Sequence, residues 1–357
     1  MERYANRQVA RLIFEDGSEY AGYSFGAMKS VSGEVVFNTG MVGYPQSLTD
    51  PSYKGQILIL TYPIIGNYGV ADRGDDLLLS CFESSRIQVQ GLLVSYYSEE
   101  YSHWEAKRSL SEWLIEDNIP AIEGVDTREI TKKLREKGTM LGKIVFEGED
   151  VQFDNQDERN LVKEVSVGEV IEYSRSRKKV LLVDCGVKVS IIRAFLNRGI
   201  TVIRVPWDYN FMDQKVDGII ISNGPGDPKK CVETIENIKK ILHKNIPILG
   251  ICLGCQLLGL AGGADTYKLK YGHRGQNQPC IEAGTKRCYI TSQNHGYAID
   301  SATLEEDWRE WFYNNNDGTN EGILHISKPF FGTQFHPEAS PGPDDTEFIF
   351  DMFVRAL

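Results

Sequence analysis

The pattern of apolar and polar side chains changes halfway along the chain. In the first half, residues 9–23 alternate apolar and polar positions on both sides of Asp16-Gly17, a dipeptide that favours a tight hairpin. Asp126 and Glu129 form a capping pattern ahead of apolar residues at helical spacing. The first half is therefore predicted to be a mixed α+β domain.

Strand and helix patterns alternate in the second half. The pattern predicts strands at residues 180–184, 201–205, 218–222 and 247–251, and helices at residues 187–198 and 232–243. Continuous apolar strands in such an order are typical of a doubly wound α/β fold with a mostly parallel sheet. A ligand site is expected at the carboxyl ends of these strands.

A polar, basic run at residues 174–179 lies between the two patterns. The chain of 357 residues is long enough for two domains, each with its own core. We therefore predict an N-terminal domain over residues 1–173, a linker over residues 174–179 and a C-terminal domain over residues 180–357.

Charge and cysteine content narrow the function classes. The chain has 39 Lys and Arg against 50 Asp and Glu, a net charge of −11, which is the wrong sign for binding nucleic acid. Seven cysteines, an odd number, favour a reducing compartment, so a cytoplasmic protein is expected. The apolar run at residues 248–264 is interrupted by Gln256 and predicts a strand leading into a helix. No signal peptide and no membrane association are expected.

Cys252 is the candidate nucleophile. It lies in the sequence G-I-C-L-G at residues 250–254, after an apolar strand and before a helical segment. This strand-turn-helix order is that of a nucleophile elbow with cysteine in place of serine. The start of a helix favours the thiolate, which is the reactive form of a cysteine. Taken alone, the pattern also fits an inert buried cysteine.

His336 and Glu338 are the candidate base and its orienting carboxylate. They follow a strand-like segment, and residues two apart on an extended chain face the same way. His336 could then take the thiol proton while Glu338 orients the imidazole ring. A lone His-x-Glu also fits a surface ion pair, and only the elbow at Cys252 favours the catalytic interpretation.

Two glycine-containing loops complete the candidate site. Residues 223–228 follow an apolar strand, and their glycines leave backbone N–H groups free to bind an oxyanion. Residues 293–297 combine an amide, an imidazole and a glycine, which suits recognition of a polar substrate. Each loop also fits an ordinary turn.

Together these motifs resemble those of class I glutamine amidotransferases, over about residues 178–357. In the first half, residues 33–41, 48–53 and 61–63 resemble the small subunit of carbamoyl phosphate synthetase, as do residues 271–279 in the second half. The resemblance therefore extends over nearly the whole chain.

The resemblance implies that glutamine is hydrolysed to glutamate and ammonia through a thioester on Cys252, with His336 and Glu338 completing the triad. It implies an oxyanion hole formed by the backbone N–H groups of Leu253 and Gly224. No metal site is expected, because the chain has no second C-x-x-C and no H-x3-5-H. The implied contacts with glutamine are made by Ser52, Gly224, Gly226, Leu253, Gln256, Asn294, Gly296 and Tyr297.

The resemblance also implies a large synthetase subunit as partner, contacted through the N-terminal domain. That subunit would make carbamoyl phosphate from bicarbonate, ATP and the ammonia, for pyrimidine or arginine synthesis. The chain has no G-x-x-x-x-G-K-[ST] phosphate loop. ATP and Mg are therefore expected on the partner, and no cofactor is expected in this chain.

Alternatives remain open at this point. Cys255 stands where the family usually has histidine, and the resulting Cys-x-x-Cys spacing also fits half a zinc site or a redox pair. The chain could instead supply ammonia to another acceptor, as in anthranilate or guanylate synthesis. It could also be a free-standing γ-glutamyl hydrolase or a regulatory subunit without catalytic activity.

Overall fold

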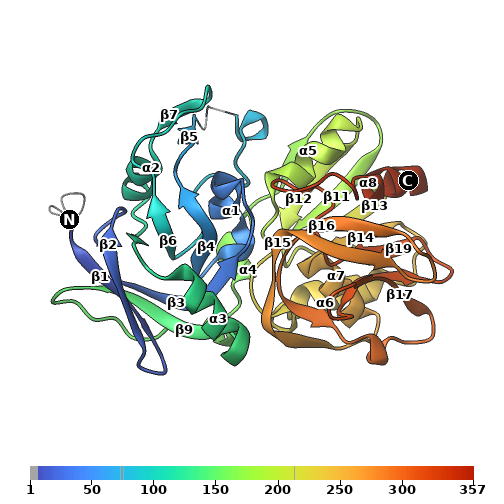
Figure 1. Ribbon diagram of the computed structural model, residues 1–357. Coiled ribbons are helices and arrows are strands. Elements are labelled where there is room, and N and C mark those ends of the chain that lie inside the picture. The colour runs from blue at the N-terminus through green and yellow to red at the C-terminus, as the bar shows by residue number, and fades with distance from the viewer. Residues whose placement is uncertain (1–6, 73, 75, 213) are drawn as a thin grey trace. The chain divides into compact units, whose positions relative to one another are not determined.

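The computed structural model describes residues 7–72, 74, 76–212 and 214–357. The chain divides into two compact units, Met1–Glu158 and Arg159–Leu357 (Figure 1). This division lies earlier than the predicted boundary after residue 173. The reason is strand β10 (Ile171–Tyr173), which pairs with β12 (Thr201–Pro206) of the second unit and is too short to be recognised in the sequence.

The predicted linker is part of the second unit. The side-chain oxygen of Thr201 accepts hydrogen bonds from the backbone N–H groups of Arg175 and Ser176, at 2.8 and 3.0 Å. The basic run is therefore a tight connection between β10 and β11 (Lys179–Asp184).

The first unit is built around a closed seven-stranded barrel in the order β1-β2-β8-β6-β4-β3-β9. The predicted hairpin is confirmed, because Gly17 adopts φ 82° between the antiparallel strands β1 and β2. The predicted helix start is confirmed as well, since the side chain of Asp126 accepts the N–H of Glu129. The barrel strands are β1 (Val9–Phe14), β2 (Glu19–Ser24), β3 (Val31–Asn38), β4 (Gln56–Ile65), β6 (Gly91–Tyr97), β8 (Ala121–Glu123) and β9 (Met140–Phe146).

Short helices and a strand pair surround the barrel strands. The helices are α1 (Tyr44–Thr49), α2 (Leu110–Glu116) and α3 (Thr127–Lys137), and the pair is β5 (Val70–Ala71) with β7 (Ala106–Arg108). Trp113 of α2 is completely buried and packs against Phe82, with ring centroids 5.2 Å apart. The first unit is therefore the mixed α+β domain that the sequence predicts.

The second unit contains a ten-stranded sheet in the order β10-β12-β11-β13-β14-β19-β18-β17-β15-β16. Five strands are parallel, namely β12, β11, β13 (Gly218–Ile221), β14 (Ile248–Ile251) and β19 (Phe330–Thr333). The antiparallel extension comprises β15 (Thr266–Glu282), β16 (Cys288–Ile299), β17 (Trp308–Asn314) and β18 (Asn320–His325). The doubly wound α/β fold is confirmed, while the antiparallel half was not predicted.

Helices cover both faces of the parallel strands (Figure 1). Leu181 and Val183 of β11 face the core formed with α6 (Val232–Ile241) and α7 (Leu253–Ala261). On the opposite face, Phe195 of α5 (Val189–Asn197) packs edge-on against Phe350 of α8 (Phe348–Ala356), with ring centroids 5.3 Å apart. The carboxyl end of β14 lies between these layers and leads directly into α7.

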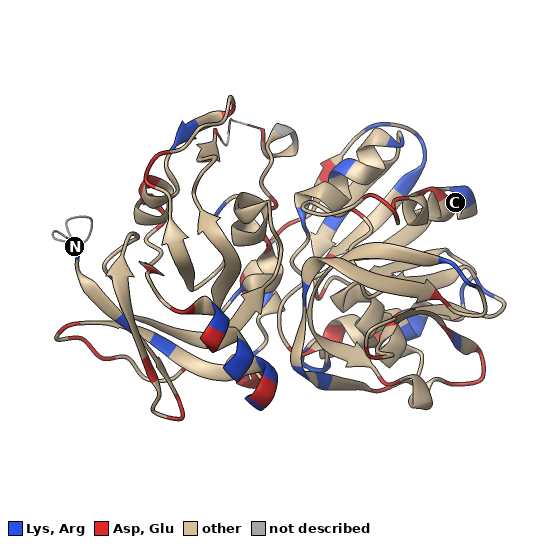
Figure 2. Cartoon of the chain, viewed as in Figure 1, with Lys and Arg blue, Asp and Glu red and all other residues tan. Residues whose placement is uncertain are grey.

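Charged side chains of both signs occur throughout each unit (Figure 2). Helix α3, for example, carries both lysines and arginines as well as glutamates. Among the described residues, no helix is both long enough and apolar enough to cross a membrane. The apolar run at residues 248–264 forms strand β14 followed by helix α7, as predicted.

Candidate active site

Cys252 occupies the sharp turn between β14 and α7. Its backbone has φ 53° and ψ −107°, a region that residues with a side chain seldom adopt. The N–H of Cys252 bonds to the carbonyl oxygen of Thr333 at 2.8 Å, which ties the turn to the neighbouring strand. The expected strand-turn-helix geometry is present, and the sulfur lies at the start of a helix.

Two glycines permit this turn. A Cβ atom on Gly254 would lie 2.0 Å from the carbonyl oxygen of Ile221, and one on Gly250 would lie 2.5 Å from that of Gly254. Both contacts are with backbone, which cannot move aside as the end of a flexible side chain could. The elbow therefore requires glycine on both sides of the cysteine.

His336 and Glu338 lie beyond the end of β19, and the side chains of both are buried. His336 Nδ1 lies 2.6 Å from Glu338 Oε1. Burial opposes a charge on the ring, but the Glu338 carboxylate and the Cys252 thiol outweigh it and raise the pKa of His336 to about 10. Nε2 of His336 is buried and makes no regular hydrogen bond within the described chain. This nitrogen is available for proton exchange.

Lys188 is a site residue that the sequence analysis missed. Its Nζ donates to Glu338 Oε1 at 2.9 Å and to the carbonyl oxygen of Ala339 at 2.6 Å. Burial alone would raise the pKa of Glu338, but the charges of Lys188 and His336 lower it to about 2. Lys188 follows the carboxyl end of β11, where a ligand site is expected. This position was the only feature of the sequence that could have indicated a role for Lys188.

Lys188→Met is expected to lower the free energy of unfolding by about 3 kcal/mol, because it leaves a buried carboxylate with one charged partner fewer. Urea denaturation of the whole chain measures this effect. Lys229→Met removes an exposed ion pair to Asp265 and is the matched control, for which little change is expected. Equal stability of Lys188→Met and the unaltered chain would contradict a structural role for the buried pair.

Gly224 and Leu253, whose backbone N–H groups are the two predicted oxyanion donors, lie close together. A Cβ atom on Gly224 would lie 2.8 Å from Leu253 Cδ2 and 2.0 Å from the carbonyl oxygen of Cys185. Leu253 is the first residue of α7, and the first N–H groups of a helix have no partner within it. Gly226, with φ 84°, faces the side chain of Leu161. Binding of an oxyanion by these residues stays a prediction.

Residues 293–297 form part of strand β16, whereas the sequence analysis placed them in a loop. They pair with the irregular strand β15, whose bulges were not recognisable from composition. The sulfur of Cys252 lies 3.7 Å from the carbonyl oxygen of Asn294, and Gln256 Nε2 donates to that of Tyr297 at 2.8 Å. A Cβ atom on Gly296 would lie 3.3 Å from the guanidinium of Arg274. The structure thus brings Asn294 to the sulfur of Cys252.

Gln334 is a second residue that the sequence analysis missed. Its side-chain Oε1 accepts a hydrogen bond from Gln256 at 2.9 Å, and its Nε2 lies 3.6 Å from the sulfur of Cys252. Gln334 is separated from these partners by 78 and 82 residues, and no local pattern indicates such a contact.

Ser52 lies in the first unit. It is buried in a short turn, where its N–H donates to Asp50 Oδ1 at 2.9 Å. The positions of the two units relative to one another are not determined. Contact of Ser52 with glutamine therefore stays a prediction.

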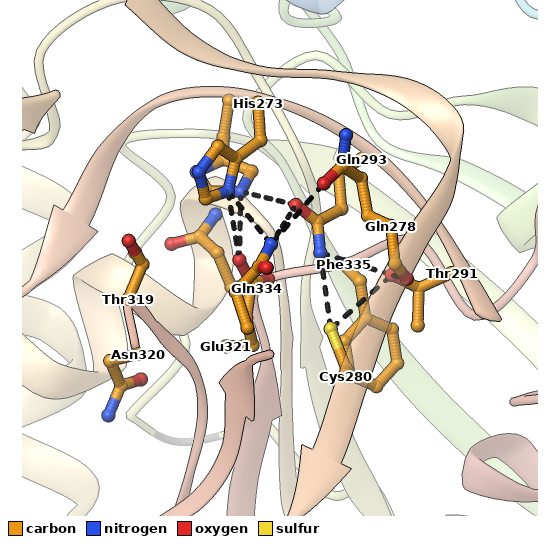
Figure 3. Close-up of polar contacts among 12 residues, drawn as sticks. His273, Gln278, Cys280, Thr291, Gln293, Thr319, Asn320, Glu321, Gln334 and Phe335 are labelled. Atoms are coloured by element: carbon orange, nitrogen blue, oxygen red, sulfur yellow. Dashed lines mark hydrogen bonds and ion pairs between the residues drawn. The ribbon is translucent and has the colours of Figure 1, made fainter. Parts of the chain in front are cut away.

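A buried polar cluster joins β15, β16 and β18 (Figure 3). His273 Nδ1 and His295 Nε2 lie 3.1 and 3.5 Å from Glu321 Oε1. Burial opposes a charge on His273, but Asp317 and Glu321 raise its pKa to about 9, whereas burial lowers the pKa of His295. The two histidines and Glu321 could also hold a metal ion. The expectation of no metal therefore stays untested.

Cys255 is completely buried beneath the elbow. Burial raises the pKa of its thiol well above the ordinary value, and a Cβ atom on Gly332 would lie 2.8 Å from its sulfur. All seven cysteines are free. A buried, protonated thiol is a poor metal ligand and redox partner. The tight packing favours a structural role for Cys255.

Comparison with known proteins gives two family matches. Residues 181–356 match the family Glutamine amidotransferase class-I, and residues 12–144 match the family Carbamoyl-phosphate synthase small chain, CPSase domain. Each match falls within one of the two structural units.

Similar curated proteins share about half of their residues with the chain. It is 50% identical to Multifunctional protein pyr-3 of Neurospora crassa over 97% of the chain and 21% of that protein. It is 53% identical to Multifunctional protein CAD of Squalus acanthias over 97% of the chain and 16% of that protein. It is 52% identical to human Carbamoyl-phosphate synthase (ammonia), mitochondrial, over 98% of the chain and 24% of that protein. The chain thus spans about a fifth of the length of these relatives.

Proposed function

Because the chain belongs to the class-I glutamine amidotransferases and carries the carbamoyl-phosphate synthase small-chain domain, we propose that it hydrolyses glutamine to glutamate and ammonia. The observation that carries this proposal is the arrangement at Cys252. A cysteine at a strained elbow interacts with a buried histidine, whose pKa it helps to raise, and the histidine is itself held by a carboxylate. This is the arrangement of an activated nucleophile with its base and orienter.

Family membership alone does not decide the source of nitrogen. One relative is named for ammonia, whereas the names of the two multifunctional relatives specify no nitrogen source. A chain that used free ammonia would have no need of a nucleophile with a base beside it. The triad therefore favours glutamine as the substrate of this chain.

The proposed reaction begins from a pair in which Nε2 of His336 has already taken the Cys252 thiol proton, because a ring with a pKa of about 10 is protonated at neutral pH. The sulfur then attacks the amide carbon of glutamine, and the N–H groups of Leu253 and Gly224 would stabilise the oxyanion. With a pKa of about 10, His336 retains the proton at neutral pH until the leaving nitrogen accepts it. Ammonia departs, and water releases glutamate from the thioester by the same steps in reverse order. Glu338 stays charged throughout and orients the ring.

We further propose that the ammonia passes to a large synthetase subunit that makes carbamoyl phosphate from bicarbonate and ATP. The small-chain domain supports this acceptor over those of anthranilate or guanylate synthesis. ATP and Mg would be bound by that partner. The free cysteines suit a reducing compartment, and we propose the cytoplasm as the location.

The chain alone is expected to hydrolyse glutamine slowly and to become faster with a synthetase subunit that binds ATP and bicarbonate. Ammonia released without an acceptor is lost to solvent, so coupling of the two sites is favoured. Glutamate release is measured for the chain alone, for the complex, and for the complex with ATP and bicarbonate. Equal rates in all three would show an uncoupled glutaminase, and no hydrolysis in any of them would contradict the proposed activity.

A further inference from the structure

The side chain of Gln334 lies between the nucleophile and a second buried amide, and the proposed reaction does not use it. It is 1% exposed, and its polar atoms face Cys252 on one side and Gln256 on the other. The backbone around it is held in place, because the Gln334 N–H bonds to the Glu321 carbonyl oxygen at 2.9 Å. Glu321 belongs to the buried cluster next to which Gln334 is drawn in Figure 3.

The orientation of the Gln334 amide follows from a backbone carbonyl group. Nε2 of Gln256 lies 2.8 Å from the carbonyl oxygen of Tyr297, which can only accept a hydrogen bond. The nitrogen end of Gln256 therefore faces this oxygen, and its other N–H is directed to Gln334 at 2.9 Å. The side-chain oxygen of Gln334 must accept this hydrogen bond. The NH₂ group of Gln334 therefore faces the sulfur of Cys252.

We propose that Gln334 is a catalytic residue that donates a hydrogen bond to the sulfur of Cys252, and that Gln256 is the positioning residue that orients it. The proposal rests on the proposed glutaminase function and extends it. When the thiol proton moves to His336 Nε2, the sulfur becomes an anion, and a hydrogen bond to an anion is stronger than one to a neutral thiol. The Gln334 amide keeps its own protons throughout.

The other groups near the sulfur can gain or lose a proton, whereas the Gln334 amide cannot. His336 stabilises the anion only while it is protonated, and its charge depends on Glu338 and Lys188 behind it. The buried thiol of Cys255 carries no charge at neutral pH. An amide donor does not titrate, so Gln334 would support the anion at every pH.

The test makes the same change, glutamine to methionine, at three buried glutamines of the full chain. These are Gln334, Gln256 and Gln293. The rate at which iodoacetamide alkylates Cys252 is measured against pH by mass spectrometry of its peptide. Gln334→Met is expected to move the half-maximal pH upward by about one unit and to lower kcat for glutamine about tenfold. Gln256→Met should give a smaller shift in the same direction, because the Gln334 amide could then rotate.

Gln293→Met is the control for loss of a buried amide. Nε2 of Gln293 donates to the sulfur of Cys280 at 3.2 Å and to Thr291 at 3.0 Å, so the same kind of contact is lost at a different cysteine. The half-maximal pH for Cys252 should stay at its original value. A shift as large as that of Gln334→Met would assign the effect to packing and overturn the proposal.

The proposal is also overturned if, in Gln334→Met, Cys252 is alkylated with the same half-maximal pH as in the unaltered chain and kcat for glutamine is unchanged. If that variant does not fold, Gln334→Leu, which removes the donor without adding a charge, replaces it and must raise the half-maximal pH. Alkylation needs no glutamine, so it remains measurable even in a chain without glutaminase activity. The failure of this proposal can therefore be distinguished from failure of the proposed function.

Discussion

Cys252→Ser is expected to lower glutamine hydrolysis by about 10⁴-fold or more, because serine cannot supply a thiolate and no other residue occupies the elbow. The fold should be unchanged, since serine has nearly the same size and shape and inherits the same backbone conformation at φ 53°. Glutamate release measures the loss. If the proposed synthetase partner makes carbamoyl phosphate, its synthesis from free ammonia should survive, because the proposed site of that reaction is on the partner.

Cys288→Ser is the matched control for this substitution. Cys288 is exposed and lies at the start of β16, so its replacement should leave glutamate release unchanged. A glutamine-like alkylating agent should label Cys252 rather than Cys255, whose thiol is held protonated by complete burial. Hydrolysis at the original rate by Cys252→Ser, or preferential labelling of Cys255, would end the assignment of the nucleophile.

His336→Ala is expected to lower kcat by about 10² to 10⁴, the usual contribution of a general base. Glu338→Gln should cost less, because it keeps the shape of the orienting group and removes only its charge. Steady-state glutamate release gives both values. Glu338→Gln is preferable to alanine, since alanine would leave Lys188 buried without its partner at 2.9 Å.

His243→Ala serves as the control for this pair of variants, because His243 is exposed and lies outside the site. It should retain the original kcat. Small and equal losses for His336→Ala and Glu338→Gln would mean that the pair only supports the fold. A larger loss for Glu338→Gln than for His336→Ala would reverse the two roles.

The parts of the site that could be predicted are those formed by neighbouring residues. The elbow at Cys252 depends on the glycines at positions 250 and 254, and the pairing of His336 with Glu338 depends on their spacing of two. Lys188 and Gln334 lie 150 and 82 residues from their partners, so only the folded sheet brings them together. Long-range contacts of this kind leave no periodic signal in the sequence.

The same reasoning applies to the fold. The parallel strands were predictable because they are largely apolar, and some, such as β14, are continuous apolar runs. The barrel was not, because its closure depends on pairing of β1 with β9 and on the three-residue strand β8. Residues 159–173 lie on the other side of the boundary from that predicted for a similar reason, since only long-range contacts, such as the pairing of β10 and the packing of Val162 in the core of the second unit, show where they belong.

Closure of the barrel in the first unit limits how another chain can bind there. Every barrel strand has a neighbour on both sides, so most strand edges are already paired, although β2 pairs with β8 only at Tyr23 and Ser24. Recognition by strand addition is therefore restricted to short stretches such as the remaining edge of β2. Elsewhere on the barrel, another chain would contact side chains on its loops, its helices and the outer faces of its strands. Such an interface can be altered one side chain at a time without opening the barrel.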